Sequence, residues 1–399
     1  MNDAETITAS AEAERRPPRV LQVLPALATG GVERGTVDLA AALAAAGWGS
    51  FIASAGGAMV REAERAGATH IELPLASKNP FVMRANVRRL ASIIETHGID
   101  IVHARSRAPA WSARAAARRT GAHFVTTFHN AYGAKTAWKR RYNAVMGAGE
   151  CVIAISEFVA RHAIETYGLD PARVRVVHRG IDTERFDPER VSPERMIQLA
   201  RQWGLPDGLP VVMLPGRLTR WKGHEVLIAA LRRLGRRELR CLIVGGGNSR
   251  YRGELEAGLK RDPPPCGVGF AEECRDMAAA YMLADIVVSA STEPEGFGRI
   301  AVEAQAMGRP VIATAHGGAL ETVVPGETGW LVPPGDPAAL AAAIAEALDL
   351  LPEERLALAD RAQAHVRQNF TVARMTEQTI AIYEELLGIG ARALGSVAA

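Results

Sequence analysis

Residues 284–303 read ADIVVSASTEPEGFGRIAVE. The apolar first part of this stretch is typical of a buried β-strand, and we expect a helix around Glu303. Glu295 would then lie at the carboxyl end of the strand, which is the edge where ligands bind open α/β sheets. Two carboxylates that accept hydrogen bonds suit a ligand rich in hydroxyl groups, with help from the backbone amides of Phe297 and Gly298. Two solvated glutamates on a surface helix are the alternative interpretation.

The overall composition is that of a globular protein. The chain has 399 residues, 48% of them hydrophobic and 23% charged, and this length predicts two domains with large cores. No apolar run is long enough to span a bilayer, and the polar N-terminus does not resemble a signal or transit peptide. We expect residues 1–17 to be a disordered tail. The four cysteines lack metal-binding spacing, which predicts reduced thiols in a cytoplasmic protein.

Short β-rich runs alternate with amphipathic helical runs along most of the chain, and the alternation starts again near residue 211. This order predicts βαβ units and parallel sheets, and therefore an α/β fold with two Rossmann-like, doubly wound domains. The expected boundaries are 18–196 for an N-terminal acceptor-binding domain, 195–209 for a linker, 205–371 for a C-terminal donor-binding domain and 372–399 for a helical end that packs back on the first domain.

One segment, 78–141, carries thirteen basic and two acidic residues, a net charge of +11 in a chain whose total is +3. Such a surface attracts phosphate in a lipid head group, a membrane or a nucleic acid. Because no nucleic-acid-binding motif accompanies the charge, we predict peripheral membrane contact and no nucleic-acid partner. Trp111, Trp138 and Tyr142 lie among the charges, as in interfacial segments. Solvated helix faces are the alternative.

Polar or flexible residues directly follow several expected strands. Gly30 and Gly31 stand between the first strand and a helix, where backbone amides can approach a phosphate. A tight turn that needs glycine would explain them equally well. Arg217 and Lys222 follow the first strand of the second half, and charges in such a loop are more often functional than structural. His129 ends a strand of the first half and is a candidate functional group.

Together these motifs resemble the retaining GT-B glycosyltransferases of family 4, also called group 1. The resemblance extends over nearly the whole chain from residue 19 and rests on the order and spacing of its segments. They are GGVER (30–34), GRLTRWKG (216–223), AYMLADIVVSAS (280–291), EGFG-x4-E (295–303) and GRPVIATAHGGALETV (308–323). The sequence also resembles bacterial enzymes that build lipopolysaccharide core or related envelope glycolipids. The GT-B fold implies two Rossmann-like domains that face a deep cleft.

The resemblance implies roles for individual residues. The expected donor-binding residues are Gly30, Gly31, Arg217, Lys222, Glu295, Gly296, Phe297, Gly298, Glu303 and Glu321. Of these, Gly31, Arg217 and Lys222 would hold the diphosphate, and Glu303 would bind the ribose. Glu295 would bind the transferred sugar, with help from neighbouring amides. The expected catalytic residues are His129, Arg217, Lys222 and Glu295. Asn130 follows the histidine where many relatives carry Asp, which puts an acid–base role for this neighbour in doubt.

The implied reaction moves a sugar from a nucleotide diphosphate sugar with retention of the anomeric configuration. We expect a UDP-sugar first and a GDP-sugar second. No Asp-x-Asp element stands at an expected strand end, and Arg217 and Lys222 could stabilise the leaving diphosphate, so we expect neither a metal nor a cofactor. The basic segment favours a lipid-linked or lipopolysaccharide-core acceptor at the inner face of the cytoplasmic membrane.

Other functions stay open. The acceptor could be a soluble small molecule or a polysaccharide instead of a lipid. A nucleotide-sugar epimerase would share the fold, but the EGFG-x4-E element is not expected in one. A phosphorylase is disfavoured by the modest length of the chain. An inactive scaffold would have no reason to retain Arg217, Lys222, Glu295 and Glu303 together.

Overall fold

The structure is a computed structural model that describes residues 16–389. Residues 1–15, which make up most of the expected disordered tail, lie outside the described part. The chain divides into two compact units, each described by itself below. The first unit contains 16–154, His162–Val177 and 376–389, and the second contains Ile155–Arg161 and His178–Met375.

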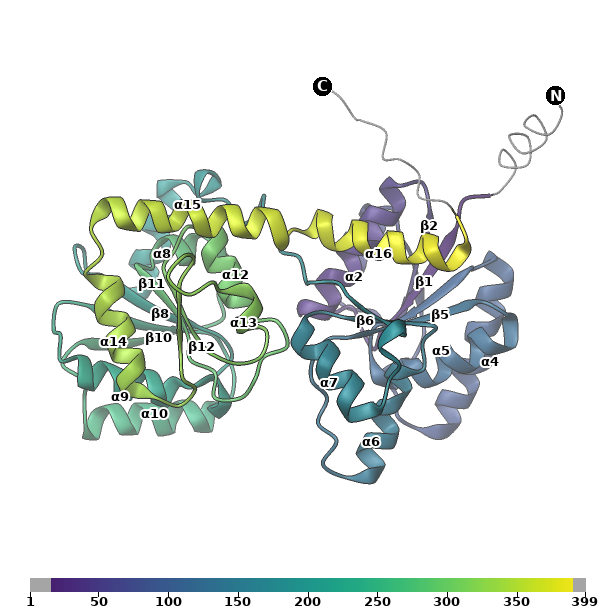
Figure 1. The fold of residues 1–399 in the computed structure, drawn as a ribbon, viewed down its shortest axis with the longest axis horizontal. Coiled ribbons are helices and arrows are strands. Elements are labelled where there is room, and N and C mark those ends of the chain that lie inside the picture. Colours follow the sequence, from purple (N-terminus) through teal and green to yellow (C-terminus); the bar gives the residue numbers. More distant parts are fainter. Residues whose placement is uncertain (1–15, 390–399) are drawn as a thin grey trace, which may run out of the picture. The chain divides into compact units, whose positions relative to one another are not determined.

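Among the described residues, the first unit is built on a seven-stranded sheet with the order β3-β2-β1-β4-β5-β6-β7. Figure 1 labels β1, β2, β5 and β6 of this sheet. All paired strands are parallel. The strands are β1 (Arg19–Val23), β2 (Gly49–Ser54), β3 (Thr69–Glu72), β4 (Ile101–Ala104), β5 (His123–Phe128), β6 (Cys151–Ala154) and β7 (Val174–Val176). The chain builds outward from β1 on one side and from β4 on the other. These two strands therefore flank a topological switch point, where ligands bind open α/β sheets.

Helices connect the parallel strands of the first unit. They are α2 (Gly31–Ala45), α3 (Val60–Arg65), α4 (Pro80–His97), α5 (Arg107–Thr120) and α6 (Ala137–Asn143), followed by the 3₁₀ helix η1 (Ala144–Gly147). Local sequence sets their ends: in α4, the Asn79 side chain accepts from the Phe81 amide at 2.9 Å, and Gly98 ends the helix in the left-handed conformation. Helices α4 and α5 pack against each other.

The second unit has a six-stranded sheet within its described residues, with the order β10-β9-β8-β11-β12-β13. Its paired strands are also parallel. They are β8 (Val211–Pro215), β9 (Arg240–Val244), β10 (Gly267–Ala271), β11 (Ile286–Ser289), β12 (Val311–Thr314) and β13 (Trp330–Val332). Every residue of β8 and β12 is buried, as expected for parallel strands covered on both faces. Here the switch point lies between β8 and β11.

The helices of the second unit surround this sheet. They are α8 (Pro193–Trp203), α9 (His224–Leu234), α10 (Ser249–Arg261), α11 (Met277–Met282), α12 (Arg299–Ala306), α13 (Ala319–Thr322), α14 (Pro337–Leu348) and α15 (Pro352–Asn369). Helices α9 and α14 pack on each other, and α12 contacts β11, β12 and α15. The expected α/β fold with two Rossmann-like parallel-sheet domains is confirmed.

The connection between the two halves differs from the expectation. Residues 195–209, expected to be a linker, include most of helix α8, which packs on α11 and buries Leu199. Residues 178–196, expected in the first domain, belong to the second unit. The proline and charges of this stretch suggested a linker, but Pro193 occupies the first turn of the helix, where proline is tolerated.

Two helices belong partly to each unit. Helix α7 (Glu157–Tyr167) begins in the second unit and ends in the first, whereas α16 (Val372–Leu387) begins in the second and returns to the first at Thr376. The returning part is fixed by Tyr383, whose hydroxyl lies 2.6 Å from Nδ1 of the buried His103 on β4. The Thr127 hydroxyl lies 2.7 Å from the other ring nitrogen of His103, Nε2. The C-terminal end of the described chain thus contributes to the core of the first unit.

Within residues 16–389, no helix combines the length and the apolar character needed to cross a bilayer. The four cysteines, all in this range, are free thiols, and burial raises the pKa of each of them. Cys151, Cys241 and Cys266 are buried and fill space in the core, whereas Cys274 is only partly buried.

Candidate functional site

The loop after β8 brings a lysine onto the carboxyl edge of the second sheet. It contains a short 3₁₀ turn, Arg220–Lys222, that ends at Gly223 with φ +74°. A Cβ atom on Gly223 would lie 1.8 Å from the carbonyl oxygen of Ala290, so the loop can pack this closely on the segment after β11 only with glycine. This close approach carries Lys222 to the EGFG segment.

Lys222 and Glu295 form a nearly buried ion pair. Nζ of Lys222 lies 2.7 Å from Oε1 of Glu295, and the two side chains are only 10% and 17% exposed. The Ser291 hydroxyl donates to the same oxygen, and the ammonium lies 4.7 Å from the centre of the Trp221 ring. An ammonium has three donors, so two remain for phosphate oxygens, and the carboxylate keeps acceptor positions for hydroxyl groups.

Arg217 lies in the same loop, directly after β8. Its side chain is exposed, and among residues 16–389 its guanidinium has no hydrogen-bond or ion-pair partner. An arginine fork without a protein partner can bind the oxygens of a phosphate bidentately. Together Arg217 and Lys222 supply two cations at one sheet edge.

The backbone of the EGFG segment is rigidly held. The Gly318 amide donates to the Glu295 carbonyl at 2.9 Å, and a Cβ atom on the left-handed Gly317 would lie 2.4 Å from that same oxygen. The Gly296 carbonyl accepts from the Ser156 hydroxyl at 2.6 Å. Phe297 is buried against Phe370, with ring centres 5.6 Å apart.

The backbone amides that follow are available to a ligand. Within the described range, the amides of Phe297 and Gly298 donate to no acceptor. Gly298 is the left-handed N-cap of α12, so these amides precede the N-terminus of a helix. Fixed amide donors in this position favour hydroxyl or anionic oxygens of a ligand.

Glu303 lies on α12 with its carboxylate oriented by two neighbours. The residue is 6% exposed, the Tyr281 hydroxyl donates to its Oε2 at 2.9 Å, and Nε of Arg299 donates to its Oε1 at 3.0 Å. Burial raises the pKa of Tyr281 well above its usual range, and the charge of Glu303 raises it further. Tyr281 therefore stays protonated and donates one hydrogen bond to Oε2 of Glu303. A carboxylate oxygen can accept more than one hydrogen bond, so Oε2 can also accept from a ligand hydroxyl.

Glu321 has a different environment from the other predicted residues. Its carboxylate accepts from the amides of Glu157 and Phe158 at 2.7 and 2.8 Å and bonds Nε2 of His178 at 2.9 Å. Burial raises the pKa of Glu321, but the hydrogen bonds from His178 and the two amides outweigh this effect and lower it. Glu321 caps the first turn of α7, and a direct contact with a donor stays a prediction.

Three predicted residues belong to the first unit. Gly30 precedes α2 with φ 166°, an extended conformation open to any residue, so a turn that needs glycine does not explain it. Gly31 is the first residue of that helix. His129 follows β5 and is half-buried, and its amide donates to the Tyr132 hydroxyl at 3.4 Å. All three follow the carboxyl ends of strands, as expected.

Sequence reasoning missed residues that orient the predicted ones. Tyr281 and Ser291 both occur in the quoted segment AYMLADIVVSAS. Ser291 follows β11, so its place at a strand end was an available signal, whereas Tyr281 lies on α11 and had none. Ser156 and His178 lie far away in the sequence and reach the site only through the fold. No local pattern could have assigned them.

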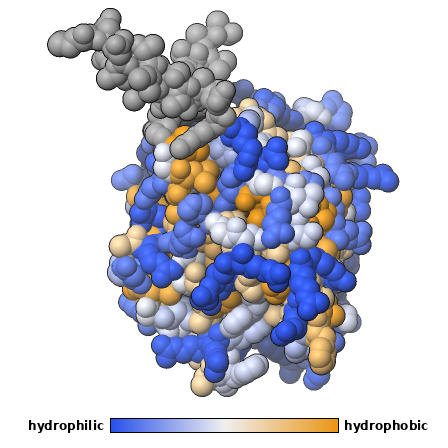
Figure 2. Space-filling view, turned by 90° about the vertical axis from the view of Figure 1, so that its right-hand side faces the viewer, coloured by the Kyte–Doolittle hydropathy of each residue, from blue (hydrophilic) through white to orange (hydrophobic). Residues whose placement is uncertain are grey.

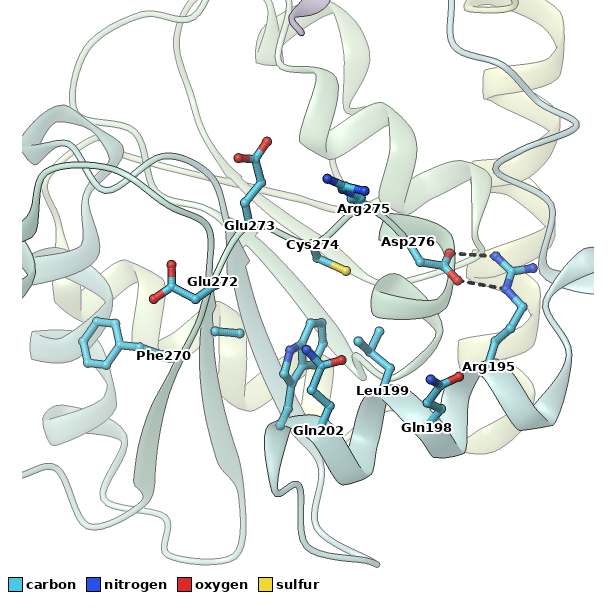
Figure 3. A pocket seen from close by; sticks show the side chains of 12 residues that line it. Arg195, Gln198, Leu199, Gln202, Phe270, Glu272, Glu273, Cys274, Arg275 and Asp276 are labelled. Carbon is cyan, nitrogen blue, oxygen red and sulfur yellow. Dashed lines mark hydrogen bonds and ion pairs between the residues drawn. The ribbon is translucent and has the colours of Figure 1, made fainter. Parts of the chain in front are cut away.

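A pocket of about 570 Å³ lies elsewhere in the second unit, between α8 and the segment after β10 (Figure 3). None of the predicted site residues lines it. Its charges are largely paired, since Arg195 bonds both oxygens of Asp276 at 2.9 and 2.7 Å and Arg252 pairs with Glu272. This pocket therefore does not bring the predicted site residues together.

Comparisons with known proteins identify the family of the chain. Residues 29–185 match the family described as Glycosyltransferase Family 4, and residues 196–365 match Glycosyl transferases group 1. A curated D-inositol 3-phosphate glycosyltransferase from Acidothermus cellulolyticus is 30% identical over 79% of this chain and 73% of its own.

Solved structures show the same relationship. A glycosyltransferase from Rickettsia africae superposes with a TM-score of 0.85 at 39% identity, over 94% of this chain and 99% of that one. Anabaena HepE, solved with UDP-glucose, has the same fold, with a TM-score of 0.79 at 24% identity over 92% and 99%. These matches cover both units of the chain. The protein therefore belongs to the glycosyltransferases of family 4 and group 1, and it is an enzyme of this class.

Proposed function

We propose that the enzyme moves a sugar from a nucleotide diphosphate sugar, with UDP-sugar the first choice, and retains the anomeric configuration. The observation that carries the proposal is the group at the carboxyl edge of the second sheet. There, Lys222 pairs with Glu295 at 2.7 Å beside the unpartnered guanidinium of Arg217 and the free amides of Phe297 and Gly298. Two cations suit a diphosphate, and a carboxylate with amide donors suits sugar hydroxyls.

The proposed reaction breaks the bond between the sugar C1 and the diphosphate oxygen. The electron pair goes to the diphosphate, whose new charge Arg217 and Lys222 stabilise. An acceptor hydroxyl attacks C1 from the face that the diphosphate leaves, and its proton passes to the departing phosphate oxygen. Retention follows from resemblance to family 4, in which His129 would lie beside the reacting sugar.

The proposed transfer needs no metal ion, because two protein cations meet the diphosphate charge that Mg²⁺ meets in other transferases. We expect the initial rate of transfer to be unchanged after dialysis against EDTA and unchanged when Mg²⁺ is restored. A loss of rate on chelation that Mg²⁺ or Mn²⁺ reverses would contradict this part of the proposal.

The proposed acceptor is a lipid-linked or lipopolysaccharide-core molecule at the inner face of the cytoplasmic membrane. The support comes from the first unit, where most of the thirteen basic side chains of segment 78–141 are exposed. Phe81 and Trp138 are 83% and 77% exposed, and Trp138 lies on α6 directly before Lys139, Arg140 and Arg141. Aromatic and basic residues on one short helix suit an anionic membrane surface.

One face of the molecule is mostly polar. Figure 2 shows a face on which hydrophilic side chains predominate and hydrophobic ones form small, separate groups. A protein with this surface would bind a membrane peripherally, through charge and a few aromatic side chains.

A soluble phosphorylated acceptor is the second candidate. The observation that favours it is the similarity to the Acidothermus cellulolyticus relative, a D-inositol 3-phosphate glycosyltransferase. Both candidates place a negative charge on the acceptor. They differ in whether the product is recovered with lipids or with the soluble fraction.

The test compares glycolipids and soluble glycosides, by mass spectrometry, between a strain that lacks the protein and complemented strains. We expect one sugar mass to be missing from a lipid extract. Wild type and a Glu273→Ala control should restore it, and Glu303→Ala should not. Loss from a soluble phosphorylated glycoside instead would select the second candidate. Full restoration by Glu303→Ala would contradict the donor site.

A further inference from the structure

One arginine of the basic segment differs from the others because it is buried. Arg105 directly follows β4 and is only 6% exposed. Its Nε is fully buried without a partner, and no hydrogen bond or ion pair reaches its guanidinium from the described residues. Only its backbone amide is engaged, with the Val23 carbonyl at 2.9 Å.

The groups that face Arg105 do not neutralise it. His103, two residues earlier on the same face of β4, is bonded to Tyr383 and Thr127. Burial lowers the pKa of the Arg105 guanidinium more than the interactions with Tyr383 on α16 and Asp38 on α2 raise it, and neither residue forms a hydrogen bond or an ion pair with Arg105. A guanidinium stays charged in proteins, and a buried charge without a counter-ion is costly.

The position of Arg105 in the fold is one where ligands bind. Its amide joins the carboxyl ends of β1 and β4, the two strands that flank the switch point of the first sheet. The next residue, Ser106, is the N-cap of α5 and makes no side-chain capping bond, and the first turn of α5 has no acidic residue. The helix N-terminus adds amide donors and a positive potential to the same place.

We propose that Arg105 is the receptor for an anionic group, a phosphate or carboxylate, on the acceptor molecule. This inference rests on the proposed function, because it identifies the acceptor class for that reaction. A bound oxyanion supplies the missing counter-charge and accepts hydrogen bonds from the unpaired N–H groups of Arg105. Of the residues expected to hold the donor diphosphate, the two cations, Arg217 and Lys222, belong to the second unit, and Gly31 of the first unit would contribute only its backbone. We therefore assign the side chain of Arg105 to the second substrate.

The test measures thermal unfolding of the full chain with inorganic phosphate as the probe. The buffer is free of phosphate and of constant ionic strength, and saturating UDP occupies the donor site. Wild type is compared with Arg105→Met and with Arg65→Met, which removes an exposed cation on α3 of the same unit. We expect phosphate to raise the melting temperature of wild type and Arg65→Met but not of Arg105→Met.

The same experiment separates the alternatives. Without phosphate, we expect Arg105→Met to melt no lower than wild type, because it removes an uncompensated charge. A large loss of stability there, together with no response of wild type to phosphate, would show a structural arginine and overturn the proposal. An equal phosphate response in Arg105→Met would also overturn it. A phosphate response that UDP abolishes would assign the anion to the donor.

Kinetics with an identified acceptor gives a second measurement. Losing a hydrogen-bonded charge pair to the acceptor should raise its KM about 10- to 100-fold in Arg105→Met. The KM for the donor should change little. A raised KM for the donor with an unchanged KM for the acceptor would overturn the proposal. Failure of the proposed function is distinct, since it would appear as no stabilisation of wild type by UDP.

Discussion

At the scale of single residues, the Lys222–Glu295 pair of the candidate site keeps two opposite charges paired in a mostly buried position. The two residues are 73 positions apart and meet because Gly223 lets their loops pack closely. Removing one partner of such a pair leaves the other charge uncompensated, which costs more than removing both. A diphosphate that binds Lys222 can replace part of this pairing without exposing the ammonium to water.

His224 follows this loop and makes the second unit sensitive to acid. It is fully buried at the start of α9, and burial, followed by the charge of Lys222, lowers its pKa to about 4. The unfolded chain therefore takes up a proton as the pH falls through about 6.5, whereas the folded chain resists until about 4. Above about pH 6.5 the neutral His224 contributes fully to the stability of the fold. As the pH falls from about 6.5 to about 4, the free energy of unfolding decreases by roughly 3 kcal/mol.

We predict that His224→Gln flattens the dependence of stability on pH. Urea unfolding of wild type and variant at several values between pH 7.5 and 4.5 measures it. His103 is also held well below its usual pKa by burial, so a smaller slope should remain in the variant. Equal slopes for the two proteins would show that His224 is not the group responsible.

At the scale of elements, α6 is the short helix to which we assign the proposed membrane contact. It begins at Thr136, whose side chain accepts from the Lys139 amide at 3.2 Å. Such a cap stabilises a helix of only two turns. Trp138 and the three basic residues after it are exposed, so they contribute nothing to a core.

We predict that Trp138→Ala weakens binding to vesicles that contain phosphatidylglycerol on the order of tenfold, from the transfer free energy of one large apolar side chain. Sedimentation with vesicles measures the bound fraction, and binding should fall as salt is raised. Leu356→Ala is the matched control, since Leu356 is 65% exposed on α15 of the second unit. Equal loss in both variants, or in neither, would rule out α6 as the contact.

The elements differ in how well sequence predicted them. Strands such as β8 and β11 are short runs made almost wholly of apolar residues, so their pattern is decisive. Helix α8 was mistaken for a linker because its exposed face is charged and only Leu199 is buried. Tertiary packing on α11, which a local pattern does not contain, stabilises it.

At the scale of the whole molecule, two sheets repeat one plan, each with a switch point between its first strand and a later neighbour. Sequence order predicts this repetition, and hence which loops gather at a sheet edge. The same order predicts that Lys222, Glu295 and Glu303 lie at one edge of the second sheet. Partners such as Ser156, His178 and Tyr383 depend on contacts across more than a hundred residues, so sequence alone could not supply them.

The return of α16 to the first unit has a practical consequence for engineering. Exchange of modules between family members is a natural way to combine the donor choice of one enzyme with the acceptor choice of another. A chimera joined near residue 185 would inherit the Tyr383 position from the wrong parent, because that tyrosine bonds His103. Three segments must therefore travel together from one parent: 16–154, 162–177 and 376–389.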